Sequence, residues 1–234
     1  VDHHDVLESD DLMREGGDFS DLVVVGAGAI GLEWATIFRR RGVTVTVIEM
    51  MPQVLPGLDA DVAKRLASAL RRGGIEVLTD TKVESLRRRE GGCEVVLGDG
   101  RVVPADRVLV AVGRTANIDP EALINAGVAV ERRIIIDNRM RTTRSGVWAA
   151  GDAAGEAPML AHVATRQGLI AVEDMLGHDI RWRDDLTPWA VFSEPEAAGV
   201  GLNVEQAAAR GIAAREGRAD YRSLGRPRAD GSTE

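Results

Sequence analysis

The sequence predicts an α/β fold in which a parallel sheet is followed by an antiparallel β-meander. Two observations support this prediction. Short apolar runs at residues 22–26, 43–49 and 75–78 alternate with helical patterns, as expected when each crossover between parallel strands is a helix. Three alternating segments follow near residues 81–87, 93–97 and 101–104, with a Gly-Asp-Gly turn at 98–100. Such a pattern is typical of antiparallel strands joined by hairpins.

The chain of 234 residues has an ordinary globular composition, with 44% hydrophobic and 28% charged residues. Its net charge of -8 gives no reason to expect nucleic acid or an anionic membrane as a partner. The longest apolar stretch, residues 22–32, is too short for a membrane span. The single cysteine, Cys93, cannot form an internal disulfide, so we expect a packing thiol in a cytoplasmic protein. The adjacent His3 and His4 lack further ligands, and we expect no metal site.

The strongest motif is a glycine-rich turn between the first predicted strand, residues 22–26, and a helix that runs from about residue 29 to 41. Gly26 allows a sharp turn, Gly28 allows the backbone to approach a pyrophosphate, and Gly31 allows helix and strand to pack closely. Amides at the helix N-terminus would bind the phosphates. The turn therefore predicts a Rossmann-like dinucleotide site.

An acidic residue makes this prediction more specific than a glycine pattern alone. Glu49 ends the second predicted strand, eighteen residues after Gly31. A carboxylate at this place accepts hydrogen bonds from both hydroxyls of an adenosine ribose. It would repel a 2′-phosphate, so the motif favours NAD over NADP.

The remaining elements follow in order along the chain. Helical spacing of apolar residues predicts a helix that ends near Arg72, and residues 107–112 form a buried strand pattern. Two strand-like pieces at 133–137 and 146–150 precede a helical pattern over 159–176. Residues 1–20 are polar and acidic without a sustained period, so we expect them to lead into a domain.

Taken in this order, the chain resembles the flavin-dependent pyridine nucleotide-disulfide oxidoreductases. The resemblance rests on the glycine turn with Glu49, the meander, Ala111-Val-Gly-Arg-Thr-Ala-Asn117 and Gly146-Val-Trp-Ala-Ala-Gly-Asp152. It covers about residues 22–211 and is closest to the dihydrolipoamide dehydrogenase branch, because of the Leu160-Ala161-His162 segment.

The resemblance implies a domain plan. Residues 1–17 would be the end of a preceding FAD-domain segment or a linker, and 18–135 a Rossmann-like NAD-binding domain. Residues 136–187 would be the C-terminal part of the FAD-binding domain, and 188–234 the incomplete start of an α+β dimerisation domain. A homodimer is implied for the full-length protein.

The resemblance also implies residues that bind NAD and FAD. Asp152 corresponds to the aspartate that bonds the ribityl chain of FAD, and residues 159–162 to the helix start beneath the flavin. Glu33 corresponds to an acid near the nicotinamide that pairs with a lysine outside this chain. For His162 we favour helix packing or a backbone role over acid-base catalysis. The complete set is Gly26, Gly28, Ala29, Ile30, Gly31, Glu33, Glu49, Gly113, Arg114, Gly151, Asp152, Met159, Leu160, Ala161 and His162.

The catalytic groups that the resemblance implies are not in this sequence. The family passes electrons between NAD(H), FAD and a cysteine pair, with a C-terminal histidine and glutamate as acid-base partners, and this chain has one cysteine. We therefore expect no catalytic residue here and no disulfide turnover by these residues alone. We expect a portion of a longer flavoprotein whose N-terminal FAD half-domain and complete interface domain lie elsewhere.

Two alternatives stay open at this point. The chain could belong to a related NADH-flavin reductase that uses a quinone or mercuric ion as acceptor. It could also be a stand-alone NAD-binding module without catalysis. Cys-x-x-x-x-Cys upstream and His-x-x-x-x-Glu downstream in the coding sequence would favour the disulfide reductase.

Overall fold

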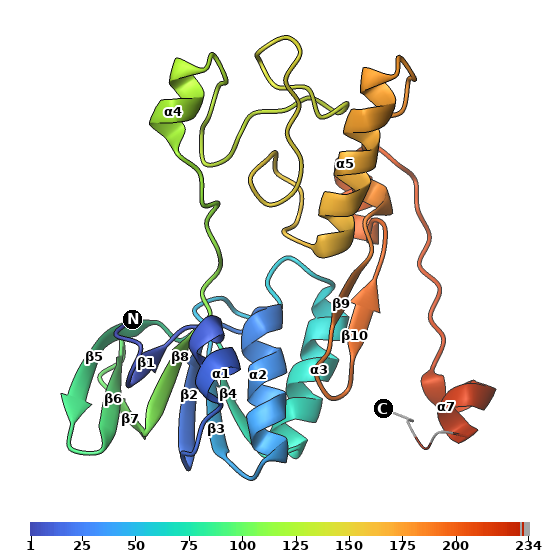
Figure 1. The fold of residues 1–234 in the computed structure, drawn as a ribbon. Coiled ribbons are helices and arrows are strands. Elements are labelled where there is room, and N and C mark those ends of the chain that lie inside the picture. Colours follow the sequence, from blue (N-terminus) through green and yellow to red (C-terminus); the bar gives the residue numbers. More distant parts are fainter. Residues whose placement is uncertain (230, 232–234) are drawn as a thin grey trace. The chain divides into compact units, whose positions relative to one another are not determined.

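The computed structural model describes residues 1–229 and 231, which divide into two compact units (Figure 1). Unit 1 comprises residues 1–113, 189–199 and the chain from 203 onward, and unit 2 comprises 114–188 and 200–202. No helix within the described part of the chain is long and apolar enough to cross a membrane. The domain boundaries implied by the resemblance stay predictions.

Unit 1 is built on a five-stranded parallel sheet with the strand order β1-β8-β2-β3-β4. Helix α2 (Ala29–Arg40) connects β2 (Asp21–Val25) to β3 (Thr44–Ile48), and α3 (Ala60–Arg72) leads to β4 (Ile75–Leu78). On the other side of β2 lies β8 (Arg107–Val110), in a register that pairs Val24 with Leu109. The sheet and its connections confirm the α/β prediction. Because the strands are parallel, their carboxyl ends share one edge.

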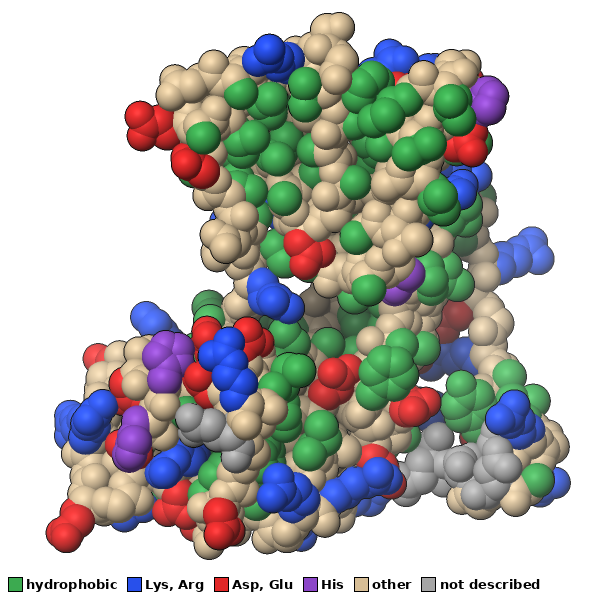
Figure 2. Space-filling model, in the orientation of Figure 1, with side chains coloured by type: hydrophobic (Ala, Val, Ile, Leu, Met, Phe, Trp, Pro, Cys, Tyr) green, Lys and Arg blue, Asp and Glu red, His purple; other side chains and the backbone are tan. Residues whose placement is uncertain are grey.

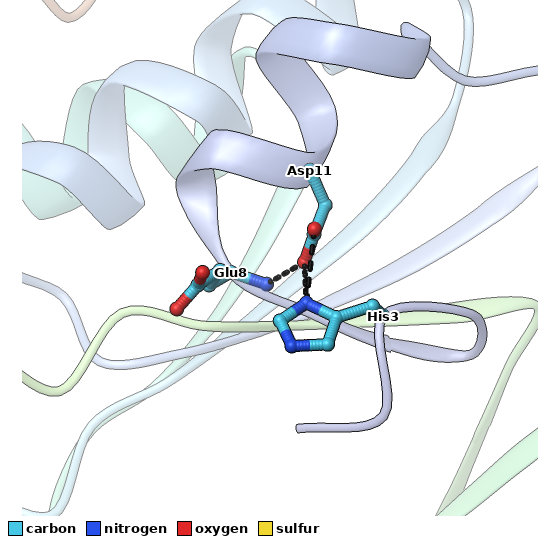
Figure 3. A group of neighbouring side chains, drawn as sticks. All are labelled: His3, Glu8 and Asp11. Carbon is cyan, nitrogen blue, oxygen red and sulfur yellow. Dashed lines mark hydrogen bonds and ion pairs between the residues drawn. The ribbon is translucent and has the colours of Figure 1, made fainter.

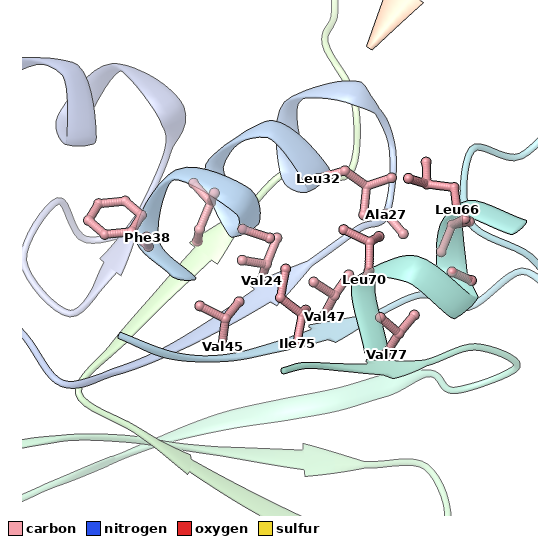
Figure 4. Packing of buried hydrophobic residues seen from close by; sticks show 14 of the residues in the cluster. Val24, Ala27, Leu32, Phe38, Val45, Val47, Leu66, Leu70, Ile75 and Val77 are labelled. Atoms are coloured by element: carbon pink, nitrogen blue, oxygen red, sulfur yellow. The ribbon is translucent and has the colours of Figure 1, made fainter. Parts of the chain in front are cut away.

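The main hydrophobic core lies between this sheet and the two helices (Figure 4). Apolar residues three or four apart face the sheet from each helix, which is why these segments are helical. Fully burying one such side chain stabilises the fold by about 1.5–3 kcal/mol. The labelled core residues are Val24, Ala27, Leu32, Phe38, Val45, Val47, Leu66, Leu70, Ile75 and Val77.

The predicted meander covers the opposite face of the sheet. It consists of β5 (Val83–Arg89), β6 (Gly92–Leu97) and β7 (Val102–Ala105), all paired antiparallel. Central strand β6 buries Cys93, Val95 and Leu97 in a second cluster, which also contains Val23 and Val108 from the sheet. Unit 1 therefore has three layers, and the expectation that Cys93 is a packing thiol is confirmed.

The N-terminal residues form regular structure that the sequence analysis missed. Strand β1 (Val6–Leu7) pairs in parallel with β8, and α1 (Ser9–Glu15) follows it. Leu7 and Leu12 belong to the main core. A strand of two residues is too short to show an alternating pattern, so only its long-range pairing with β8 defines it.

A hairpin from late in the sequence packs on α2 within unit 1. Its strands are β9 (Trp189–Val191) and β10 (Ala197–Gly199). Val191 and Ala197 join the main core, and Arg40 of α2 pairs with Glu194 at 2.5 Å. Three short helical elements come after it: α6 (Val204–Ala209), the 3-10 turn η2 (Tyr221–Ser223) and α7 (Gly225–Ala229).

Unit 2 has little regular structure apart from its helices, α4 (Pro120–Asn125), α5 (Ala161–Met175) and the 3-10 turn η1 (Asp184–Leu186). Helix α5 confirms the helical pattern predicted over 159–176. The prediction of strands at 133–137 and 146–150 was wrong, because these residues form only isolated bridges. Met140 and Gly146 have positive φ angles of 66° and 76°, so the chain turns before a ladder can extend.

A buried carboxylate holds this irregular segment against α5. The side chain of Asp174 is 1% exposed and accepts bonds from Arg141 Nε and Nη2 at 2.6 and 2.7 Å. The indole of Trp148 donates to it at 2.8 Å, and Arg139 lies at 3.4 Å. The hydrogen bonds from Arg141 hold the pKa of Asp174 at about 2, below its ordinary value of 3.8, although burial acts in the opposite direction.

We expect the Asp174 carboxylate to stabilise unit 2 in a pH-dependent way. Since its pKa is lower in the folded state, its contribution is fully present above pH 3.8 and is lost as the pH falls through about 2. Asp174→Asn should lower the melting temperature at neutral pH and flatten its decline over that acidic range. The exposed Glu156→Gln is the matched control. Thermal melts that show the same acid dependence for all three proteins would contradict this role.

Candidate nucleotide-binding site

Two glycines of the predicted turn are required by packing within the chain. Gly26 has φ 105°, and its amide donates to Ile48 O at 2.8 Å. A Cβ atom on Gly26 would lie 2.5 Å from Ala111 O. A Cβ atom on Gly31 would lie 2.0 Å from Gly26 O. No side chain fits at either position, so the strand-turn-helix geometry depends on both glycines.

Gly28 differs from its two neighbours because nothing in the fold requires it. It is the N-cap of α2 with φ -75°, which any residue adopts. A Cβ atom added there would meet no atom of the chain within 4 Å. The space in front of Gly28 is open, as it must be for a ligand to approach the backbone.

The first turn of α2, next to Gly28, has backbone amides without a partner inside the helix. The first helical hydrogen bond runs from Leu32 N–H to Gly28 O at 3.0 Å, so the amides of Ala29, Ile30 and Gly31 precede it. Ala29 is exposed and Ile30 half-buried. Free amides and the positive end of the helix dipole together favour an anion.

Glu49 lies at the carboxyl end of β3 and is 7% exposed. Its Oε2 accepts the Ala27 amide at 2.8 Å, and its Oε1 accepts the Met51 amide at 2.9 Å. The sequence analysis predicted a ribose contact and did not foresee these bonds within the chain. A carboxylate has about four acceptor sites, so each oxygen keeps capacity for a further donor.

The loop that follows Glu49 is also tied to the glycine turn. The Leu55 amide donates to Ala27 O at 2.9 Å, and Leu55 is 4% exposed despite a strained φ of 48°. Glu49 and this loop therefore fix Ala27 from two sides, through its amide and through its carbonyl.

Three other residues predicted to bind the nucleotide are Glu33, Gly113 and Arg114. Glu33 of α2 is half-buried, and its Oε1 accepts the Phe192 amide of the hairpin at 3.0 Å. Gly113 is exposed with φ 123° and ends the first segment of unit 1, while Arg114 is exposed and begins unit 2. No local pattern predicts the contact between Glu33 and Phe192, because 159 residues separate the two.

Unit 2 brings together the second group of predicted residues. Gly151 has φ 83°, and the exposed Asp152 follows it. The Gly151 amide donates at 2.7 Å to Oε1 of Gln167, a side chain of α5 that is 1% exposed. Gln167 is a residue that the sequence analysis missed. The feature that could have identified it is a polar side chain at a core-facing position of the predicted helix.

The start of α5 resembles that of α2 in having free amides. Its first hydrogen bond runs from Ala164 N–H to Leu160 O at 3.0 Å, so the amides of Ala161, His162 and Val163 precede it. Met159 and Leu160 are half-buried, whereas Ala161 and His162 are exposed. His162 Nε2 lies 2.8 Å from Pro188 O, and since a carbonyl only accepts, Nε2 carries the proton.

One further group of side chains at the N-terminus has ligand-like residue types (Figure 3). One ligand atom each from His3, Glu8 and Asp11 lies within 4.8 Å of the others. Asp11 already accepts from the Glu8 amide at 2.9 Å and bonds His3 Nδ1 at 2.9 Å. The Glu8 amide bond in particular lowers the pKa of Asp11. Figure 3 shows the Glu8 carboxylate pointing away from the other two side chains. Helix capping explains this grouping.

Cys93 offers no reactive thiolate. It is 1% exposed on β6, and burial raises the pKa of its thiol. A thiol needs to ionise to act as a nucleophile, so this side chain is a packing group.

Comparisons with known proteins agree with this geometry. The pyridine nucleotide-disulphide oxidoreductase family model matches residues 1–168. Dihydrolipoyl dehydrogenase of Thermus scotoductus is 38% identical over 98% of this chain and 51% of its own length. The crystal structure of LpdA from Mycobacterium tuberculosis superposes with a TM-score of 0.90 and 30% identity, covering 100% of this chain and 51% of that one.

A second flavoprotein of known structure has the same fold. The HOCl-induced flavoprotein disulfide reductase RclA from Escherichia coli matches with a TM-score of 0.83 and 28% identity, over 97% of this chain and 53% of its own. The chain thus spans about half the length of the relatives it matches.

Gly31→Ala should destabilise unit 1 strongly, because its methyl group would overlap Gly26 O in a turn that has no room to move. Overpacking of this kind costs about 1–3 kcal/mol, and a clash with backbone belongs at the upper end. Denaturant unfolding measures the loss. Gly28→Ala is the matched control, since its methyl group meets open space. Equal stability of the two variants would contradict the packing role of Gly31.

Proposed function

Because the chain belongs to the pyridine nucleotide-disulphide oxidoreductase family, we propose that it supplies the NAD(H)-binding part of a flavin-dependent disulfide reductase that resembles dihydrolipoyl dehydrogenase. In the complete protein, electrons would pass between NAD(H), FAD and a disulfide or dithiol. The chain spans about half the length of its relatives, so this activity is proposed for the complete protein.

The observation that carries the proposal is the open space at Gly28. Gly28 has an ordinary φ angle and no neighbour for a Cβ atom, so the fold does not require the absence of a side chain there. It makes sense as the place where a pyrophosphate meets the backbone. The free amides of Ala29, Ile30 and Gly31 would donate to that pyrophosphate.

Glu49 would add selectivity for the adenosine ribose. Its carboxylate is fixed by the Ala27 and Met51 amides and keeps acceptor capacity. Two ribose hydroxyls would donate to it, whereas a 2′-phosphate would meet a like charge. We therefore propose NAD as the nucleotide.

The residues of unit 2 fit part of a flavin site. Asp152 is exposed beside Gly151, where its carboxylate has room to accept from a hydroxyl of the ribityl chain. The free amides at the start of α5 suit the polar edge of the ring, and the helix dipole favours negative charge there. A bound flavin supplies two-electron chemistry between a nicotinamide and a disulfide. His162 would help to position the helix start through its bond with Pro188 O.

Disulfide turnover would require residues outside these 234. Their only cysteine is the buried Cys93, and thiol-disulfide exchange needs an accessible thiolate and a second sulfur. We propose that this chain alone binds the nucleotide without turning over a disulfide.

A second candidate differs only in the electron acceptor. The likeness to RclA, an HOCl-induced flavoprotein disulfide reductase, at a TM-score of 0.83, supports a flavoprotein disulfide reductase other than dihydrolipoyl dehydrogenase. The two candidates share the nucleotide site proposed here. Activity assays of the complete protein with lipoamide and with other disulfides would separate them.

Gly28→Ala should weaken NADH binding at least tenfold, or by about 1.4 kcal/mol, because the methyl group fills the space that the pyrophosphate needs. Stability should fall by no more than about 1 kcal/mol, the usual cost of alanine at the N-cap of a helix. Titration calorimetry with NADH measures the affinity. Gly217→Ala is the control, since that glycine also has open space around it. Unchanged affinity in Gly28→Ala would rule out this site.

Glu49→Gln should weaken NADH binding by about 1.5–3 kcal/mol, roughly 10- to 150-fold, because one charge-assisted bond to a ribose hydroxyl is lost. The amide of glutamine would also disturb Ala27 or Met51, and that disturbance would affect both nucleotides. A ribose contact predicts a larger loss for NADH than for NADPH. Calorimetry with both nucleotides separates the effects, with the exposed Glu84→Gln as control. Equal losses for NADH and NADPH would disprove the ribose assignment.

A further inference from the structure

Unit 1 contains a cavity of about 270 Å³ between α3 and the loop that joins β3 to α3. Its buried lining residues are Val54, Ala63 and Ala67, which are 0%, 1% and 7% exposed. The two alanines belong to α3, and their small side chains leave the space open. Pockets for drug-sized ligands measure about 300–1,000 Å³, so the size of this cavity suits a smaller ligand.

The charged side chains around the cavity are all positive. Lys64 and Arg71 line it from α3, and their spacing of seven residues places them on the same face of the helix, about two turns apart. Ala67 lies between them. None of the described residues that line the cavity is acidic. Elsewhere on unit 1, acidic and basic side chains are interspersed (Figure 2), so the positive lining is a local property of this cavity.

Three side chains at the cavity have hydrogen-bond donors that the fold leaves unused. Lys64 makes no hydrogen bond or ion pair with any residue that the structure describes. Arg71 donates from Nη2 to Val77 O at 2.9 Å, which fixes its guanidinium and leaves Nη1 and Nε unbonded within the described chain. The hydroxyl of the half-buried Thr79, just after β4, also lacks a partner there. An ammonium, a guanidinium and a hydroxyl are therefore available to one ligand.

A phosphate monoester matches this set of donors. It carries about two negative charges at neutral pH and three strong acceptor oxygens, and the cavity offers two cations and a hydroxyl. Arginine binds phosphate through its planar fork and lysine binds it as a point charge. A carboxylate has one charge and two oxygens, so it would leave one cation unneutralised. The buried apolar residues of the lining would contact the organic part of the ester.

We propose that this cavity binds a small organic phosphate monoester, with Lys64 and Arg71 holding the phosphate group. The site is separate from the nucleotide site, where backbone amides next to Gly28 would bind a pyrophosphate. The proposal does not depend on NAD or flavin binding, so it is tested independently of the proposed function.

The cavity and the nucleotide site have one loop in common. Val54 lines the cavity, and the next residue, Leu55, donates its amide to Ala27 O beside the glycine turn. A test of the cavity therefore has to distinguish a phosphate monoester from the nucleotide.

Lysine acylation measures occupancy of the cavity in the 234-residue chain. The sequence has two lysines, Lys64 and the exposed Lys82, so Lys82 is an internal control. N-hydroxysuccinimidyl acetate acylates free amines, and mass spectrometry of the two peptides gives both rates. Glycerol 3-phosphate at about ten times its dissociation constant should slow acylation of Lys64 about tenfold, since only unoccupied protein reacts. The rate at Lys82 should not change, and acetate at the same ionic strength should change neither rate.

Two variants of α3 test the site without acylation. Lys64→Gln removes a cation that has no partner in the described chain. It should weaken binding of glycerol 3-phosphate at least about tenfold, as expected for the loss of one charged hydrogen bond. Arg65→Gln is the matched control, because Arg65 is exposed, carries the same charge and does not line the cavity. Titration calorimetry measures both affinities, and melting temperatures equal to that of the parent chain show that both variants fold.

Several results would overturn the proposal. Acylation of Lys64 that slows no more than that of Lys82 would show that the cavity does not bind the ester. Equal losses of affinity in Lys64→Gln and Arg65→Gln would indicate general electrostatic attraction to α3. Protection of Lys64 by acetate as strong as that by glycerol 3-phosphate would show that phosphate is not recognised. Equally strong protection by NADH would make the cavity part of the nucleotide site.

Discussion

The fold of unit 1 depends on the close contact between the start of α2 and the end of β2. At Gly31 a single Cβ atom would lie 2.0 Å from Gly26 O, so helix and strand meet at the shortest distance that a backbone allows. This contact sets where α2 begins and leaves its first amides at the carboxyl edge of the sheet. That edge also receives Glu49 from β3. One steric constraint thus brings the amides and the carboxylate to the same place.

Glu49 turns this placement into a rigid arrangement. Bonds to a charged acceptor are stronger than neutral ones, and both of its oxygens accept backbone amides. The carboxylate is therefore oriented before any ligand arrives, and a ligand does not have to order it. Preorganised groups of this kind reduce the entropy lost on binding. The same side chain supports the turn and selects the nucleotide.

Local patterns predicted most of unit 1 from the sequence, and long-range contacts explain what was missed. The glycine turn, Glu49 and the meander each have a signal within a few residues. Strand β1 depends on pairing with β8, about a hundred residues away in the chain, and Gln167 acts on Gly151 through a side-chain bond. Unit 2 was harder because hydrogen bonds to Asp174, and not ladders, organise residues 137–148. A repeating pattern of apolar residues does not predict hydrogen bonds of this kind.

The different surroundings of the three glycines have an evolutionary consequence. Gly26 and Gly31 are constrained by the fold itself, so selection for a stable protein preserves them in any descendant. Gly28 is constrained only by what binds in front of it. In a lineage that no longer used the nucleotide, position 28 would drift while its two neighbours stayed fixed. Survival of glycine at that position is therefore a sensitive record of continued use of the site.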